Sequence, residues 1–423
     1  MLQRKHAFLL IALISQAMTL SAQYDDPNFP KPQSGYGADG NYPVEVTAFP
    51  SPDFPGETIE IFHPGGVTGA VPTLFFSHGF GGTFSGYVQG MLEFIARKGY
   101  AAVFVPYPTT GASIVERYDI LLDGFRQAAR TYPNLIDTTQ VGFMGHSFGG
   151  GAMFGVSHRC FTENNWGSNG RFLFSLAPWY AYEITQAQLQ AFPPDTKLIM
   201  QVYDDDTIND HRMAIDLFNT INISTEEKDF ILVKSDTLQG HIYAADHAVP
   251  GTYQVFNALD YYAFYRLLDA LCDYTFNGNL AGKAVSLGNG SALQVAMPAG
   301  LSSRSQTDSP APLYPEDRYS FPCSGILNPR KNYCPMLTST PETAPETHVL
   351  AIAPNPTGAQ IRVTIPADAR ARQIRVFSLS GQQVLAERIS GDSEITLDLE
   401  GLPSGEYVVV VGRYRGRVSK VGE

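Results

Sequence analysis

Short apolar segments alternate with amphipathic ones between residue 57 and about residue 278. The apolar segments with the length of buried strands are 57–62, 73–78, 101–107, 140–146, 172–178, 197–203 and 229–235. The segments with helical spacing of apolar positions are 87–97, 113–131, 149–158, 211–221 and 253–274. Continuous apolar strands separated by helices predict an α/β fold, with a mostly parallel sheet covered by helices on both faces.

The pattern changes twice toward the C-terminus. Residues 279–346 lose the helical spacing and are rich in Gly, Ser and Pro, so we expect an extension that packs on the first domain or links it to the next. Residues 347–423 contain short strands separated by turns such as Leu402-Pro403-Ser404-Gly405, which predicts a small all-β sandwich. The expected α/β domain therefore spans residues 23–278.

The first residues have the order of an export signal. A short basic start precedes the apolar core Ala7–Ile14, and the small residues Ser21 and Ala22 follow. This order predicts a secretory signal peptide over residues 1–22. Because the apolar core is short and no apolar run of about 18 or more residues follows it, we expect no membrane span in the mature protein.

Composition narrows the class of protein further. Of 423 residues, 44% are hydrophobic and only 17% are charged, which suits a chain with a full core. The formal net charge of −12 repels phosphate backbones and argues against nucleic-acid binding. In an exported chain we expect Cys323 and Cys334 to form a disulfide, whereas Cys160 and Cys272 either pair or stay buried thiols. No Cys/His cluster suggests zinc.

The clearest chemical motif is GHSFGG at 145–150, which has the form G-x-S-x-G and lies where a predicted strand passes into a predicted helix. Glycines allow the sharp turn that lifts the Ser147 hydroxyl above the sheet. A serine hydroxyl needs a base to take its proton, and in this architecture the acid and the base follow the serine in that order along the chain. The motif therefore predicts a nucleophile at Ser147 and its partners further on.

Candidates for the acid and the base follow the next strands. Asp204-Asp205-Asp206 ends the strand at 197–203, and His241 follows the strand at 229–235. Both positions lie at carboxyl ends of strands, where open α/β sheets place their sites. His241 competes with His247 and His211 for the role of base, and its position beside Gly240 favours it. We interpret His146 as a packing or supporting residue.

Two backbone N–H groups are candidates for the oxyanion hole of the tetrahedral intermediate. One is that of Phe148, directly after the nucleophile, and the other is that of Phe80 in the turn His78-Gly79-Phe80-Gly81-Gly82. This turn lacks the G-K-[ST] ending of a phosphate-binding loop. Trp179 follows another strand, and either contributes to an apolar platform for an acyl or aryl group or packs beneath a loop.

Residues 40–276 resemble the α/β-hydrolase superfamily, and within it the secreted lidless esterases of the polyesterase-lipase-cutinase and dienelactone-hydrolase-like type. The resemblance is carried by SHGFGG (77–82), GHSFGG (145–150), APW (177–179) and DDDTI (204–208) with its later GH (240–241). It implies Ser147 as nucleophile, Asp206 as acid and His241 as general base. It also implies backbone donors at Phe80 and Phe148, substrate contacts from Trp179 and Phe80, and no cofactor.

Two departures from that family bear on the substrate. Polyester-cleaving members usually carry Met after the nucleophile, where this chain has Phe148, and Thr162–Gly170 has the character of an added loop. These departures do not affect the assignment of Ser147, Asp206 and His241. They do not allow a choice between lipid esters, acylglycerols and polyesters as substrates.

The C-terminal sandwich resembles the type A sorting domain of type IX secretion. The resemblance is carried by APNP (353–356), IRVFSLSGQQVL (374–385) and LPSGEYVVVV (402–411). It implies passage through the periplasm, recognition by the secretion machinery, and a location at the cell surface or outside the cell. An immunoglobulin-like spacer or binding module is the alternative.

The sequence thus predicts a secreted serine carboxylic-ester hydrolase for apolar acyl or aryl esters. Two alternatives remain open at this point. One is another acyl hydrolase with the same triad, namely a peptidase, a lactonase or a carbohydrate-ester deacetylase. The other is a catalytically silent surface-binding protein on the same scaffold.

Overall fold

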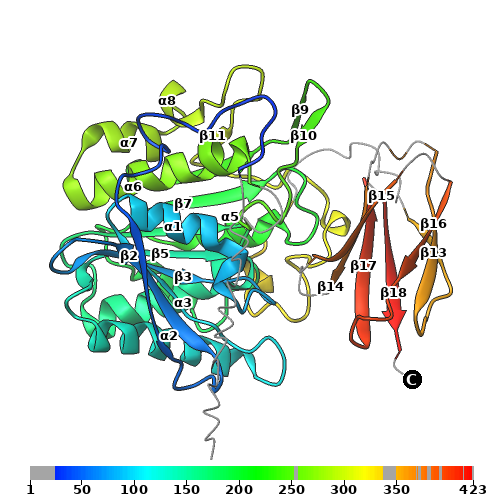
Figure 1. Cartoon of the computed structure of the whole chain (residues 1–423), viewed down its shortest axis with the longest axis horizontal. Helices are drawn as coiled ribbons and strands as arrows, with labels where there is room; N and C mark the ends of the chain where they lie inside the picture. Colours follow the sequence, from blue (N-terminus) through cyan, green and yellow to red (C-terminus); the bar gives the residue numbers. More distant parts are fainter. Residues whose placement is uncertain are drawn as a thin grey trace, which may run out of the picture.

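The computed structural model describes residues 24–251, 256–336 and 349–421, apart from residues 368, 370–372, 379–382, 390–392 and 413. The expected signal peptide and the first residues of the helix expected from residue 253 lie outside the described residues. The described chain forms a large α/β domain and a β-sandwich beside it (Figure 1).

A nine-stranded sheet with the order β1-β2-β4-β3-β5-β6-β7-β8-β11 organises the α/β domain. Its strands are β1 (Val44–Pro50), β2 (Thr58–Pro64), β3 (Val71–Ser77), β4 (Ala101–Phe104), β5 (Ile136–His146), β6 (Arg171–Leu176), β7 (Lys197–Tyr203), β8 (Lys228–Val233) and β11 (Ser305–Thr307). The six strands from β4 to β8 in that order are parallel, while β1, β2 and β11 pair antiparallel at the two sides. This is the mostly parallel sheet that the sequence predicts.

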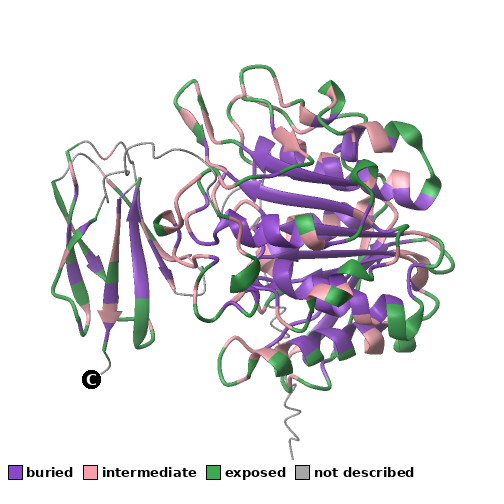
Figure 2. Ribbon diagram, turned by 180° about the vertical axis from the view of Figure 1, so that it is seen from behind, coloured by how far each residue is buried: buried purple, intermediate pink, exposed green. Residues whose placement is uncertain are grey.

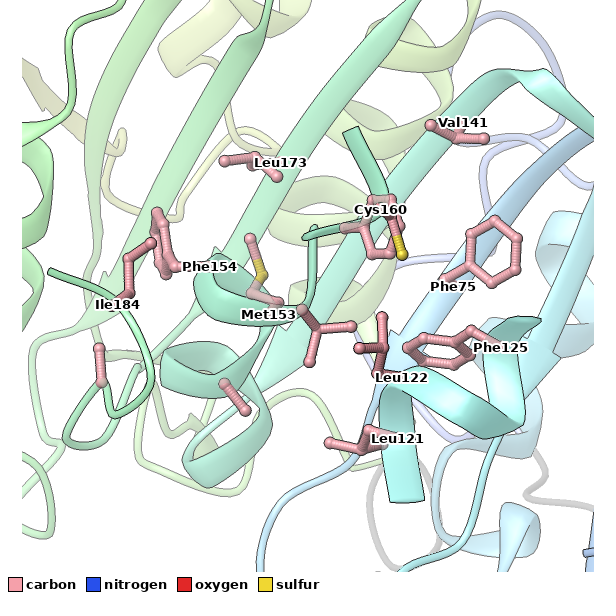
Figure 3. Packing of buried hydrophobic residues seen from close by; sticks show 14 of the residues in the cluster. Phe75, Leu121, Leu122, Phe125, Val141, Met153, Phe154, Cys160, Leu173 and Ile184 are labelled. Atoms are coloured by element: carbon pink, nitrogen blue, oxygen red, sulfur yellow. The ribbon is translucent and has the colours of Figure 1, made fainter. Parts of the chain in front are cut away.

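Helices cover both faces of this sheet, which explains why its central strands are apolar throughout (Figure 2). One face packs against α2 (Ile114–Thr131), α3 (Phe148–Asn164) and α5 (His211–Thr220), in the core shown in part in Figure 3. The other face packs against α1 (Gln89–Arg97) and α6 (Arg266–Asn277). A short helix, α4 (Gln186–Gln190), and the π-helical turn Leu259–Tyr265 before α6 complete this part of the fold.

The two cysteines left open by the sequence are free and buried, and they lie in the cores on opposite faces of the sheet. Cys160 belongs to α3 and Cys272 to α6. Because the sheet separates them, they do not pair, and burial raises the pKa of both thiols.

The extension packs on the α/β domain. Its elements in the described residues are α7 (Leu280–Ser286), α8 (Ala292–Val295), β11 and the 3-10 turns Glu316–Arg318 and Lys331–Tyr333. The sequence pattern did not predict α7 or α8, because both are too short to show a helical period. A disulfide joins Cys323 to Cys334, the pair expected from the sequence, and Arg330 forms a buried ion pair with Asp216 of α5 at 2.6 Å.

The C-terminal sandwich consists of two antiparallel sheets, with orders β12-β13-β16 and β15-β14-β17-β18. Its strands are β12 (Ala351–Ala353), β13 (Gln360–Thr364), β14 (Gln373–Ser378), β15 (Gln383–Arg388), β16 (Glu394–Asp398), β17 (Gly405–Val411) and β18 (Tyr414–Lys420). Inward-facing residues of both sheets form a separate core. The expected sandwich is therefore present, and β15 and β18 were missed because their sequences are polar.

Candidate active site

Ser147 occupies a strained turn between β5 and α3. Its φ of 55° and ψ of −117° lie in a region that L-residues rarely adopt. The turn is held on both sides, because the Ser147 N–H donates to the Leu176 carbonyl at 3.0 Å and its carbonyl accepts from the Trp179 N–H at 2.8 Å. A Cβ at Gly149 would lie 1.9 Å from the Ser77 carbonyl oxygen, so only glycine allows this approach.

The turn that follows β3 carries the second expected oxyanion donor, Phe80. It is fixed by the fully buried His78, whose ring stacks on Tyr107 with centroids 3.9 Å apart. Nδ1 of His78 donates to the Gly79 carbonyl at 2.7 Å, and Nε2 accepts from the Tyr107 N–H at 3.2 Å. Burial lowers the pKa of His78 to about 3, so this imidazole stays neutral and structural.

Asp206 lies fully buried after β7, and its carboxylate binds His247. The distance from His247 Nδ1 to Asp206 Oδ2 is 2.7 Å. Oδ1 of Asp206 accepts from the backbone N–H groups of Ile208 at 2.7 Å and Asn209 at 3.2 Å. Burial by itself raises the pKa of Asp206, but the charge and hydrogen bond of His247 outweigh it and hold that pKa below its ordinary value. The carboxylate is therefore ionised and orients one imidazole.

That imidazole is not the one expected from the sequence. His241 lies on β10 (His241–Tyr243), which pairs with β9 (Asp236–Leu238) in a hairpin, and its ring contacts Tyr243. The partners of the Asp206 side chain in the described residues are His247, Ile208 and Asn209. The histidine that binds Asp206 is therefore His247 and not His241, the candidate that the sequence favoured. Both histidines follow the last parallel strand, and only the return of the hairpin decides which one reaches the carboxylate.

Two further residues connect the Ser147 turn to the Asp206–His247 pair. His146 directly precedes Ser147, and its Nε2 donates to the His247 carbonyl at 2.8 Å. The two imidazole rings lie 4.8 Å apart. Burial and the neighbouring His247 lower the pKa of His146 to about 3. Asn209 donates from Nδ2 to Ser147 Oγ at 3.3 Å and to the Ala177 carbonyl at 2.9 Å, a role that the sequence analysis did not anticipate.

The structure also separates the roles of the neighbouring candidates. Asp204 accepts a hydrogen bond from Tyr314, and the exposed Asp205 lies 3.7 Å from Arg318. His211 is buried, and its ring bonds the Tyr203 carbonyl at 3.0 Å. Of the three adjacent aspartates, Asp206 alone reaches an imidazole among the described residues.

Aromatic side chains lie around the serine turn. Trp179 is partly exposed, and its ring lies 5.8 Å from Phe148, 5.6 Å from Phe321 and 5.8 Å from Tyr182. The Phe148 ring is buried in the core, and its backbone N–H lies at the N-terminus of α3, where the first N–H groups of a helix have no intrahelical acceptor. Phe80 remains partly exposed, with the Arg117 guanidinium 5.1 Å from its ring centre.

Comparison with known protein families gives one assignment. Residues 351–421 match the model of the secretion system C-terminal sorting domain. Proteins with this domain are exported by type IX secretion, so the chain reaches the cell surface or the extracellular space and interacts with the secretion machinery. A search of curated proteins finds no match to the chain.

Within the described residues, no helix has the length and apolar character needed to cross a membrane. In the same part of the chain, no three His, Cys, Asp or Glu side chains gather in a way that could hold a metal ion.

Proposed function

We propose that this exported chain is a serine hydrolase that cleaves carboxylic esters through an acyl-enzyme. The observation that carries the proposal is the arrangement at the ends of β5 and β7. A serine in a strained strand-to-helix turn is joined through Asn209 to a buried Asp206–His247 pair: Asn209 donates from Nδ2 to Ser147 Oγ at 3.3 Å and from its backbone N–H to Asp206, which lies 2.7 Å from His247. This is the combination that activates a serine hydroxyl in acyl-transfer enzymes.

The first half-reaction follows from the groups present. Ser147 Oγ attacks the ester carbonyl carbon while His247 Nε2 takes its proton, and the carbonyl π electrons move onto the oxygen. Asp206 keeps the proton on His247 Nδ1 and stabilises the imidazolium that forms. When the carbon–oxygen bond of the leaving alcohol breaks, His247 returns the proton to that oxygen and an acyl-serine remains.

Hydrolysis of the acyl-serine repeats these steps with water as the nucleophile. His247 takes a proton from water, the new oxyanion forms, and its collapse releases the acid and restores Ser147. The N–H groups of Phe148 and Phe80 are the donors we assign to the oxyanion, each worth about 3–4 kcal/mol in comparable sites. The His78–Tyr107 contacts give the Phe80 turn the rigidity that such donors require.

The surroundings favour an apolar acyl or aryl group. Trp179 and Phe80 are partly exposed aromatic side chains next to the serine turn, and the partly exposed rings of Tyr182 and Phe321 lie against Trp179. Aromatic side chains bind such groups by area and by ring contacts. We therefore propose lipid esters or polyester-like substrates in place of sugars or charged metabolites.

The test is hydrolysis of p-nitrophenyl esters of increasing acyl length by the purified full chain. We expect Ser147→Ala to lower kcat/KM at least about 1000-fold. The matched control is Ser224→Ala, an exposed serine before the turn Thr225–Glu227, and we expect it to keep the activity within about twofold.

A fluorophosphonate that reacts with activated serines separates the proposal from its alternatives. Labelling of Ser147 together with ester turnover supports it. Labelling of Ser147 with turnover of amides and not of esters would replace it with a peptidase, and a folded chain without labelling would indicate a binding protein.

A further inference from the structure

The outer face of the sorting-domain sheet is unusual for a sandwich. Along β17, Tyr407, Val409 and Val411 point into the core of the sandwich, while Val408 and Val410 on the opposite face are also buried. An antiparallel sandwich strand with one face in water alternates apolar and polar residues. The uninterrupted VVVV run of this strand therefore requires that something covers its outer face.

The cover is the α/β domain. Val408 and Val410, with Phe377 of the neighbouring β14, form an apolar cluster with Ile208 and Phe321. In Figure 1 the sheet that contains β14 and β17 is the one that faces the α/β domain. An ion pair between Arg375 of β14 and Asp246 lies at the same interface.

The covered residues belong to the segments that hold the proposed catalytic groups. The Ile208 N–H donates to Asp206, and Asp246 directly precedes His247 in the chain. The Phe321 N–H donates to the Ile208 carbonyl at 2.8 Å, and the Phe321 ring lies 5.6 Å from that of Trp179. The sorting domain thus touches the acid segment, the histidine segment and the aromatic surface together.

Charged side chains also lie at this interface, near Asp206. Arg415 of β18 is partly buried, and this burial, then the charge of Arg318, lowers its pKa to about 10, while the charge of Asp206 acts in the opposite direction. Among the described residues, Nε of Arg415 has no hydrogen-bond partner.

We propose that the sorting domain of the full chain covers the rim of the ester site and excludes bulky substrates until the two domains separate. Ile208 and Phe321 then become the apolar surface on which the acyl part of a bulky ester docks. This inference rests on the proposed esterase function and adds a control on access to the same site.

The test uses the full chain with a site-specific protease sequence inserted between residues 337 and 348. Both domains fold before cleavage, and size-exclusion chromatography then isolates the α/β domain. We measure p-nitrophenyl acetate as the small substrate and an emulsified long-chain triacylglycerol as the bulky one. If the docked form makes up nine-tenths or more of the uncut molecules, separation raises kcat/KM for the bulky ester at least about tenfold. The small ester changes by less than about threefold.

An interface variant tests the same point without cleavage. Val410→Glu places a charge in the apolar cluster, and we expect the uncut variant to gain activity on the bulky ester. The matched control is Thr396→Glu on β16, an exposed position in the other sheet, which leaves the ratio of the two activities unchanged.

Failure of this inference and failure of the proposed function give different results. A ratio of bulky-ester to small-ester activity that is the same before and after separation overturns the covering role while the esterase function stands. Absence of fluorophosphonate labelling at Ser147 in both the uncut and the separated protein overturns both.

Discussion

The hairpin β9–β10 and the turn after it lie side by side in the sequence but differ completely in what they contribute. His241 in the hairpin has a strand neighbour opposite it and a ring contact to Tyr243. His247 in the following turn is buried against Asp206 and its backbone carbonyl is held by His146. The comparison teaches that a histidine after the last parallel strand becomes a candidate base only when its loop returns to the acid.

Replacement of the two histidines is the strongest test of this difference. We expect His247→Ala to lower kcat on p-nitrophenyl butyrate by about 10⁴-fold or more, because Ser147 loses the base that we propose for it. His241→Ala serves as the matched control and should stay within about threefold. Equal losses in both variants, or a larger loss in His241→Ala, would overturn the assignment of the base.

Replacement of Asp206 tests the carboxylate that binds His247 and does not bind His241. Asp206→Asn keeps the size of the side chain but removes the charge that orients His247, so we expect kcat to fall by about 10³–10⁴-fold. Asp205→Asn changes the exposed neighbour and should leave kcat within about twofold. Steady-state kinetics of both variants at one pH measures this, and a comparable loss in Asp205→Asn would argue against the assigned pair.

Removal of the disulfide tests whether the segment that contains Asp206 depends on the extension, in contrast to the hairpin β9–β10. Cys323→Ser with Cys334→Ser opens a short loop beside Phe321, which pairs with the acid segment. We expect the free energy of unfolding in urea to fall by about 3 kcal/mol. The control is Ser324→Ala in the same loop, with a change below about 0.5 kcal/mol. An unchanged unfolding midpoint in the double variant would show that the extension is held by its other contacts.

Replacement of His146 has the smallest expected effect. It removes the hydrogen bond that His146 donates to the backbone carbonyl of His247, which His241 does not receive. His146→Gln weakens the hold on the His247 carbonyl, so we expect kcat to fall about tenfold with little change in KM. An unchanged kcat would mean that the turn is positioned without this hydrogen bond.

The same variant also tests how stability depends on pH. In the wild type, the pKa of His146 is about 3 in the folded chain, against an ordinary value of 6.5. Between those values the unfolded chain binds a proton that the folded chain does not, so the wild type loses stability as the pH falls below about 6.5. His146→Gln lacks this loss. The difference in unfolding free energy between wild type and variant should therefore shrink by about 1 kcal/mol from about pH 7.5 to about pH 5.5. A constant difference would show that His146 takes up its proton in the folded chain as well.

Local patterns in the sequence were sufficient for much of the molecule. The parallel strands, the helices that cover them, the turn at Ser147 and the sandwich all follow from periodicity and glycine placement, which act over a few neighbouring residues. The pairing of Cys323 with Cys334 was predicted instead from the expected export of the chain, and Asp206 was distinguished from its two neighbouring aspartates by the family resemblance. The edge strands β1 and β11 were missed, because a half-exposed or three-residue strand shows little apolar pattern.

Only the tertiary structure decided the features that depend on contacts between distant segments. Which histidine binds Asp206, what Asn209 and His146 donate to, and what covers Val408 and Val410 are all set by the return of loops separated by tens or hundreds of residues. A hydrogen bond forms only when the two atoms lie within about 3 Å of each other. Whether two distant segments come that close depends on how the whole chain packs. The sequence alone was therefore sufficient to identify the types of candidate site residues, whereas only the tertiary structure determined which of them contact one another.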